Sequence, residues 1–125
     1  MDTRTKGDKG EDIACVFLRK QGFSIVTRNY LKKWGELDIV ATKEGITHFF
    51  EVKSIVVRNE YSVDGHRPED NVHALKLKRL RRTIECYLED TNRGLGSEFQ
   101  FHVLCVYMDI SVRRARVKWL KNVVL

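Results

Sequence analysis

The chain has 125 residues, of which 42% are hydrophobic, and 23 Lys and Arg residues outnumber 17 Asp and Glu residues to give a formal net charge of +6. This length suits one domain with its own core, so we expect a single domain over residues 1–125, and the apolar content excludes a wholly disordered chain. No segment approaches the roughly 20 consecutive apolar residues of a membrane span, so we expect no membrane partner. The excess of basic residues favours a polyanionic partner such as nucleic acid.

The cysteines and the N-terminal residues bear on the compartment. Cys15, Cys86 and Cys105 are far apart and form no CxxC pair or Cys/His set of the kind that zinc sites use, so we expect three reduced thiols. The first twelve residues, MDTRTKGDKGED, hold no apolar segment after their charges, so no secretory signal is predicted. Both features favour a cytoplasmic protein.

The first half of the chain predicts one helix and three strands. Apolar residues recur at helical spacing from about Lys6 to Gln21, and Gly22 supplies a stop. Residues 23–29 are rich in β-forming side chains, and residues 30–35 are expected to turn the chain into an apolar hairpin over residues 35–54. The hairpin turn is either Glu44-Gly45 alone or the four residues 43–46.

The second half predicts a long loop, a helix and one or two strands. Residues 55–69 hold most of the turn-forming residues, and a helix is expected from Asp70 or Asn71 to Glu89. Its buried stripe consists of Leu77, Leu80, Ile84 and Leu88. Residues 98–108 are almost continuously apolar, as in a strand covered on both faces, and residues 115–125 predict a last strand and a short terminal segment. The order α-β-β-β-α-β(-β) predicts an α/β fold with a mixed central sheet and flanking helices.

Four charged residues interrupt the apolar hairpin: Glu36, Asp38, Glu51 and Lys53. Both turn lengths give the same strand register, in which Asp38 is opposite Glu51 and Glu36 is opposite Lys53. A slip by one residue would mix these charges with apolar side chains, so the hydrophobic pattern selects this pairing.

Two carboxylates directly across a strand pair destabilise each other unless positive charge lies between them. Lys53 can offset part of the repulsion between Asp38 and Glu51, and a divalent cation does so better. Mg²⁺ prefers oxygen ligands, so the pattern indicates a hydrolytic metal centre. The alternative is a surface ion-pair network that binds no metal, although the large apolar residues beside these acids favour a position at the border of a packed core.

These residues belong to a longer pattern. It comprises Gly7-x-x-Gly10-Glu11, Asn29, Gly35-Glu36-x-Asp38-Ile39-Val40, Phe50-Glu51-Val52-Lys53 and Lys76. The pattern resembles the YraN-like family of predicted endonucleases in the PD-(D/E)xK nuclease superfamily, which is related to Holliday junction resolvases, and the likeness covers roughly residues 6–106. The resemblance implies a restriction-endonuclease-like core that uses Mg²⁺ or Mn²⁺. It also implies Asp38, Glu51 and Glu11 as metal ligands, Lys53 as the catalytic lysine, and Glu36 and Lys76 as accessory residues.

The sequence KLKRLRR makes the second helix strongly basic. Exposed cations on one helix can contact successive phosphates with largely sequence-blind affinity. The expected nucleic-acid-binding residues are Lys76, Lys78, Arg79 and Arg82, with Arg58 from the preceding loop. The alternative for this face is a solvated helix with an i to i+4 ion pair such as Arg81 to Glu85.

The sequence therefore predicts a metal-dependent endonuclease acting on DNA, including branched or damaged structures in DNA repair, for which a homodimer would suit cleavage of both strands. The first alternative is a catalytically inactive nucleic-acid-binding module of the same fold. The second is a structural or interaction protein whose acidic cluster is an ion-pair network. Fold alone does not decide among the three, because function depends on the site.

Overall fold

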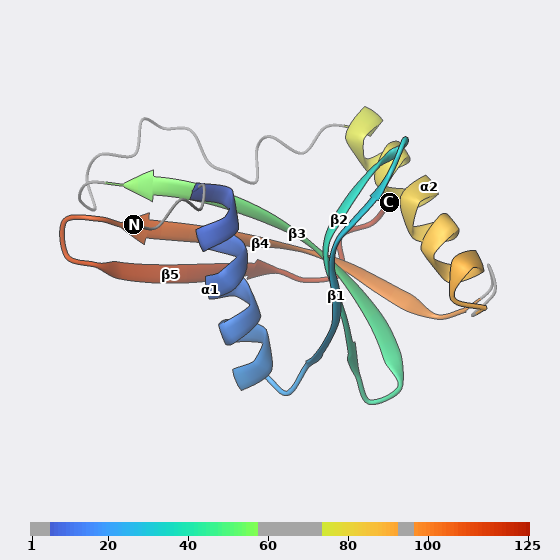
Figure 1. Cartoon of the computed structure of the whole chain (residues 1–125), viewed down its shortest axis with the longest axis horizontal. Coiled ribbons are helices and arrows are strands. Elements are labelled where there is room, and N and C mark those ends of the chain that lie inside the picture. Colours follow the sequence, from blue (N-terminus) through green and yellow to red (C-terminus); the bar gives the residue numbers. More distant parts are fainter. Residues whose placement is uncertain (1–5, 58–73, 93–96) are drawn as a thin grey trace.

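A computed structural model of the chain describes residues 6–57, 74–92 and 97–125. Five strands form one sheet in the order β1-β2-β3-β4-β5, and two helices flank it (Figure 1). The elements are α1 (Lys6–Lys20), β1 (Ser24–Lys32), β2 (Gly35–Lys43), β3 (Ile46–Val57), α2 (Ala74–Asp90), β4 (Phe99–Asp109) and β5 (Arg114–Leu120). Only β3 and β4 are parallel, so the sheet is mixed. The predicted α/β fold and element order are confirmed, and the sheet with its two helices is consistent with a restriction-endonuclease-like core.

Helix α1 ends where its sequence predicts. Gly22 adopts a φ of 95°, a conformation that favours glycine. Its N–H donates to the carbonyl of Arg19 and the next N–H, of Phe23, donates to the carbonyl of Leu18, which is the Schellman arrangement. Near the start of α1, Gly10 is buried against Ser54 of β3, where an added Cβ would overlap the serine side chain. The helix therefore approaches the sheet closely at its N-terminal end.

The first hairpin is longer than predicted. Residues 30–32 were expected in a turn but belong to β1, and only Lys33 and Trp34 lie between the two strands. The pairing of Tyr30 with Leu37 and of Lys32 with Gly35 extends the ladder to the turn. The two strands therefore project as a ribbon, and its far end lies beside α2 (Figure 1).

The second hairpin follows the predicted register over part of its length. Its two-residue turn, Glu44-Gly45, has φ values of 52° and 80°, as in type I′ turns. Ile39 pairs with Phe50 and Val40 with Phe49, as predicted. The ladder between β2 and β3 ends at Ile39 and Phe50, so the expected cross-strand pairs further along the hairpin are not formed.

Strand β3 is also longer than predicted, because residues 55–57 continue it instead of opening a loop. This extension pairs with β4 as far as Val57 and Asp109. The rest of the predicted loop, residues 58–69, and residues 70–73 lie outside the described part of the chain.

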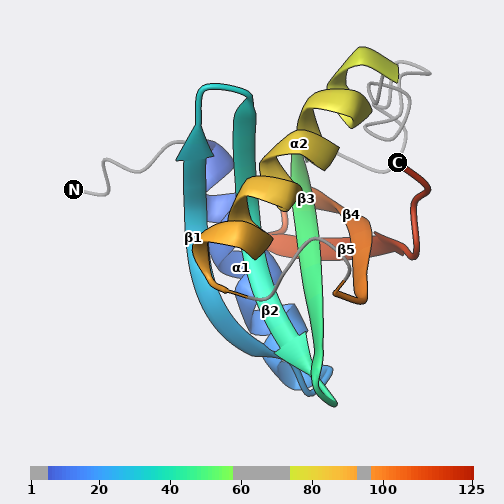
Figure 2. The same ribbon diagram turned by 90° about the vertical axis from the view of Figure 1, so that its right-hand side faces the viewer.

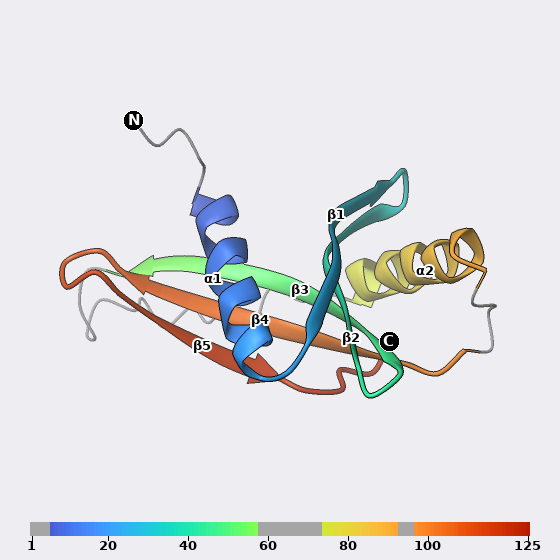
Figure 3. The ribbon, with the colours of Figure 1, turned by 60° about the horizontal axis from the view of Figure 1, so that its bottom comes forward.

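The core has two halves, one on each face of the sheet. On one face, α1 contributes Ala14 and Leu18, which pack with Ile39, Phe50 and Leu104. On the other face, the predicted stripe of α2 packs against Val40, Phe49 and Val103. Strand β4 contributes to both halves, which confirms that it is covered on both sides. In Figure 2, α2 lies across β2 and β3, and Figure 3 shows α1 crossing β3, β4 and β5.

The remaining predictions about the fold concern thiols and membranes. All three cysteines are free, as predicted, and Cys15 and Cys105 are buried. Among the described residues, none of the helices has the length and apolar character needed to cross a membrane.

Candidate active site

The site lies at the fork where β2 leaves β3. The backbone ladder stops beyond Ile39 and Phe50. At the next position the side chain of Asp38 replaces a backbone acceptor, because its Oδ2 accepts a hydrogen bond of 2.7 Å from the N–H of Val52. This bond fixes the Asp38 carboxyl in the fork. The predicted pairs Asp38–Glu51 and Glu36–Lys53 are therefore wrong as strand pairs, because a side chain occupies the place of the next backbone acceptor.

Three carboxylates gather around this fork. Glu11 of α1 and Glu36 of β2 join Asp38, and each offers an oxygen within 4.8 Å of the others. We call these three residues the acidic cluster. Glu36 was expected to face Lys53, but it lies instead with Glu11 and Asp38, since the hairpin turns away from β3 at this point.

Strand β1 supplies polar groups that hold the acidic cluster. Arg28 places Nη1 3.0 Å from Asp12 and Nη2 3.5 Å from Glu11. Asn29, whose φ is 55°, lies between Glu36 and Glu11. In the amide orientation that satisfies its neighbours, its nitrogen donates to Glu36 over 2.7 Å and to Glu11 over 3.1 Å.

Glu51 occupies a different electrostatic environment from the acidic cluster. Its side chain is buried, and Oε1 forms ion pairs with Lys53, at 3.2 Å, and with Lys76 of α2. The other oxygen, Oε2, is buried and has no hydrogen-bond partner among the described residues. A buried carboxylate oxygen without a partner is costly, so Glu51 has unused capacity to bind a donor or a cation.

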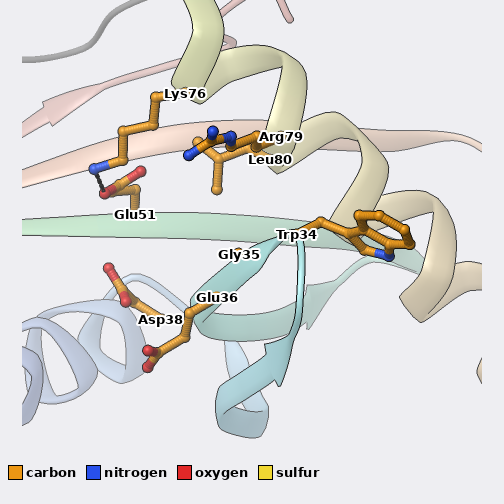
Figure 4. Close-up of a pocket in the computed structure, with 8 residues that line it drawn as sticks. All are labelled: Trp34, Gly35, Glu36, Asp38, Glu51, Lys76, Arg79 and Leu80. Carbon is orange, nitrogen blue, oxygen red and sulfur yellow. Dashed lines mark ion pairs between the residues drawn. The ribbon is translucent and has the colours of Figure 1, made fainter.

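A cavity of about 510 Å³ is lined by Glu51 and by two members of the acidic cluster, Glu36 and Asp38. Its lining residues are Trp34, Gly35, Glu36, Asp38, Glu51, Lys76, Arg79 and Leu80. Figure 4 shows Glu51 pointing to Lys76, whereas Asp38 and Glu36 lie on the other side of the β3 ribbon. Both Asp38 and Glu51 nevertheless line this pocket, although they are not paired across the strands.

The surroundings raise the pKa of two acids at the fork, Asp38 and Glu11. Burial raises the pKa of Asp38 to about 7, the bond from Val52 opposes the rise, and the charges of Glu51, Glu11 and Glu36 add to it. Burial also raises the pKa of Glu11, against the effect of Arg28. Burial is thus the largest cause of both shifts, and the neighbouring carboxylates add to it.

The two lysines respond in opposite directions. Burial and the neighbouring Lys76 lower the pKa of Lys53, although Glu51 opposes this. Burial is the largest single influence on Lys76 and acts to lower its pKa, but the hydrogen bond to Glu51, the contact with Lys53 and the charges of Glu51 and Asp38 together raise it. Lys53 is therefore the lysine that gives up its proton more readily.

Comparison with known proteins places the chain in a family. The family described as "Uncharacterised protein family UPF0102" matches residues 10–110, which cover the acidic cluster, Glu51 and both lysines. The chain belongs to the UPF0102 family. It is 41% identical over 104 residues to a UPF0102 protein of Campylobacter jejuni strain 81-176, covering 83% of this chain and 85% of that protein.

UPF0102 proteins from other organisms are similar to this chain to about the same extent. A UPF0102 protein of Helicobacter hepaticus is 42% identical over 88 residues, with 70% of this chain and 73% of the relative covered. One from Helicobacter pylori strain HPAG1 is 40% identical over 103 residues and covers 82% of each chain. The similarity thus extends over most of the UPF0102 fold described above.

The structure brings most of the predicted site residues of this UPF0102 chain together. Asp38 and Glu51 share the pocket, Lys53 contacts Glu51, and Glu11 lies beside Asp38. Sequence reasoning missed Arg28, because nothing in its spacing shows that β1 faces the start of α1.

The predicted nucleic-acid-binding residues have different environments. Lys76 is turned into the pocket toward Glu51, whereas Lys78, Arg79 and Arg82 are exposed. The i to i+4 ion pair between Arg81 and Glu85, which belongs to the alternative interpretation of this helix as a solvated face, is present at 3.4 Å. Arg58 lies outside the described residues.

Proposed function

We propose that this protein is a Mg²⁺- or Mn²⁺-dependent endonuclease-like hydrolase that cleaves phosphodiester bonds in DNA. The observation that carries the proposal is the acidic cluster, whose three carboxylates approach within 4.8 Å at a pocket that also contains Glu51. Carboxylates this close repel one another in a partly dehydrated setting, so the arrangement favours a bound cation. The cluster contains two of the three ligands that the resemblance implies, Glu11 and Asp38, together with Glu36, while the third, Glu51, lines the same pocket as Asp38.

The donor set suits a hard divalent cation. Every candidate ligand is a carboxylate oxygen, which Mg²⁺ prefers and Mn²⁺ accepts, and none is a thiolate or imidazole. The raised pKa of Asp38 and the unpartnered Oε2 of Glu51 both mark charge or bonding capacity that a cation would satisfy. When bound, such a cation lowers the pKa of a coordinated water and polarises a phosphoryl oxygen.

The chain's own residues then have distinct roles. Glu11, Asp38 and Glu51, with Glu36, would hold the cation, while Asn29 keeps Glu36 and Glu11 in place. The Lys53 ammonium, 3.2 Å from Glu51, would orient the nucleophile and balance the negative charge that develops on the phosphate. Its lowered pKa makes Nζ a better proton donor than the ammonium group of an ordinary lysine.

DNA is the proposed substrate because cations surround the same pocket. Lys76 and Arg79 line it, and the exposed Lys78 and Arg82 extend the positive surface along α2. Such contacts bind phosphates with little regard to sequence, which suits a nuclease that recognises the shape of branched or damaged DNA in repair. A homodimer, which would bring two such sites together, and action in the cytoplasm belong to the same proposal.

The direct test is cleavage of duplex, single-stranded and four-way-junction DNA in Mg²⁺, Mn²⁺ or EDTA. The wild-type protein should cut with either metal and not in EDTA, and Asp38→Asn and Lys53→Met should each lose at least about 100-fold in rate. Glu44→Gln, in the exposed turn of the same hairpin, is the matched control and should cut normally. Cleavage that persists in both Asp38→Asn and Lys53→Met would contradict the proposed site.

One observation favours the inactive nucleic-acid-binding module as a second candidate. Oε1 of Glu51 is already bonded to Lys53 and Lys76, and Asn29 bonds two acids of the cluster, so much of the site is satisfied by protein groups. Such a module would bind DNA with strong salt dependence and leave every substrate intact in both metals. The same assay, read by gel shift as well as by cleavage, separates the two functions.

A further inference from the structure

A tryptophan with cations packed on it stands at one end of the pocket. Trp34, in the turn between β1 and β2, lines the cavity, and the guanidinium carbon of Arg82 lies 3.3 Å from the centre of its ring. The Lys33 ammonium lies 4.3 Å from the same centre, and Arg79 of α2 also lines the cavity. We call Lys33, Trp34, Arg79 and Arg82 the tryptophan patch.

The cations of the tryptophan patch are not neutralised by acids. Three nearby cations are, since Lys32 pairs with Asp90, Lys76 with Glu51 and Arg81 with Glu85. Within the described residues, the three patch cations form no ion pair with a carboxylate, and all three are exposed. Three like charges are therefore held close together by two separate elements, at an electrostatic cost that packing alone does not require.

The chemistry of the patch fits phosphate better than a nucleobase. Arg82 occupies a face of the Trp34 ring at stacking distance, so a base cannot stack there without displacing it. A guanidinium that rests on an aromatic ring still presents its N–H groups at the edge, where they can bind phosphate oxygens. The ring holds a flexible side chain in one place and so reduces the entropy lost on binding.

We propose that the tryptophan patch binds the sugar-phosphate backbone of a nucleic-acid strand and directs that strand into the pocket, with Trp34 as the positioning residue for Arg82. The inference rests on the proposed function for the identity of the ligand, because the patch and the acidic cluster lie along one cavity. It adds a binding surface made jointly by the β1–β2 turn and α2. The bases are not read, so binding is independent of sequence.

The test measures binding of a fluorescein-labelled oligonucleotide of mixed sequence, single-stranded or duplex, by anisotropy in EDTA over a range of salt concentrations. Lys33→Gln, Arg79→Gln and Arg82→Gln should each weaken binding roughly three- to tenfold and reduce the slope of log K against log salt by about 0.7 to 0.9. Trp34→Leu removes no charge but should also weaken binding, and Arg82→Gln should then cost less in the Trp34→Leu chain than in the wild type. Trp34→Phe should restore most of the affinity.

The control residues are also arginines, one of them beside an aromatic ring, but they lie outside the tryptophan patch. Arg116 lies 5.1 Å from the ring of Tyr107 at the other end of the sheet, and Arg81 is exposed on α2 but paired, so Arg116→Gln and Arg81→Gln should change binding less than twofold. Thermal unfolding of every variant verifies the fold. Equal losses in patch and control variants, additive effects of Trp34→Leu and Arg82→Gln, or equally tight patch-dependent binding to anionic vesicles would overturn the inference.

The two proposals fail separately. If the patch variants lose binding while the wild type cleaves nothing in Mg²⁺ or Mn²⁺, the binding surface stands and the nuclease proposal falls. If the wild type cleaves DNA and the patch variants bind as the wild type does, the nuclease proposal stands and this inference falls.

Discussion

Replacing Asp38 by asparagine should stabilise the metal-free protein, although it removes a central site residue. Asparagine has nearly the same shape, and its side-chain oxygen can still accept the hydrogen bond that the N–H of Val52 donates. What the substitution removes is a negative charge that is buried and lies near Glu51, Glu11 and Glu36. The folded protein is therefore relieved of a desolvation cost, and of a smaller repulsion, that the unfolded chain does not experience.

The magnitude follows from the pKa of Asp38, which rises from 3.8 to about 7 on folding. Because one pKa unit corresponds to about 1.4 kcal/mol, ionising this group costs roughly 4 kcal/mol more in the folded than in the unfolded chain. The pKa is raised in the folded state, so the stabilising contribution of Asp38 is complete below pH 3.8 and is lost as the pH rises through about 7. The gap in unfolding free energy between Asp38→Asn and wild type should thus widen by roughly 4 kcal/mol between about pH 4 and pH 8.

Urea unfolding in EDTA, followed by tryptophan fluorescence at a series of pH values, measures this gap. Comparing the two proteins at each pH cancels the titration of groups that they share. Glu44→Gln removes an exposed charge from the same hairpin and should change stability by less than about 0.5 kcal/mol at every pH. A gap that does not vary with pH, or an Asp38→Asn protein less stable than wild type at pH 8, would refute the idea that repulsion at the fork is strong.

Three further predictions concern the metal, the buried histidines and the contact between α1 and β3. Mg²⁺ at 100 times its Kd should add about 2.7 kcal/mol to the stability of the wild type and so close much of its gap to Asp38→Asn. A thermal scan showing the same Mg²⁺-induced shift in Asp38→Asn and Glu11→Gln would argue against the site. His102 is 1% exposed, stacks with His48 and accepts the N–H of Asn122, and burial together with His48 and Lys121 lowers its pKa from 6.5 to about 4. Since this pKa is lowered, the stability that neutral His102 contributes is present above pH 6.5 and is lost as the pH falls through about 4. In an acid denaturation series, the unfolding free energy of the wild type should therefore fall by up to roughly 3 kcal/mol relative to that of His102→Asn. Gly10→Ala should cost roughly 1 to 2 kcal/mol, because overlap with Ser54 outweighs the better helix propensity of alanine, and the cost should vanish in a Ser54→Gly chain if the overlap is its cause.

Much of the fold was predictable because local patterns determine it. The turn residues Glu44 and Gly45, both able to adopt positive φ, fix the hairpin register, and the alternation of apolar residues agrees with that register. The stripe of α2 and the two-sided burial of β4 follow from the same kind of pattern. In each case the interaction that matters lies within one element or between neighbours in the chain.

The arrangement of the site was less predictable, because it depends on where a ladder stops. Alternation alone places Leu37 with Ile39, yet Leu37 packs into the α2 half of the core while Ile39 packs into the α1 half. The cause is the fork, where the carboxyl of Asp38 bonds Val52 and lets the first residues of β2 turn away from β3. The sequence pattern identified Asp38 and Glu36 as unusual but could not show that their partners come from α1 and β1.

The balance of charge at the fork strengthens the case for a cation. The acidic cluster and Glu51 contribute four carboxylates at the fork. Within the described residues, Lys53 and Lys76 pair with Glu51 and Arg28 pairs with Glu11, whereas Glu36 and Asp38 form no ion pair with a cationic side chain. A divalent ion would neutralise these two carboxylates, whereas the metal-free protein limits their charge through the raised pKa of Asp38. Because the lysines neutralise Glu51 and Arg28 neutralises only one member of the acidic cluster, the cluster is where the cation would gain most.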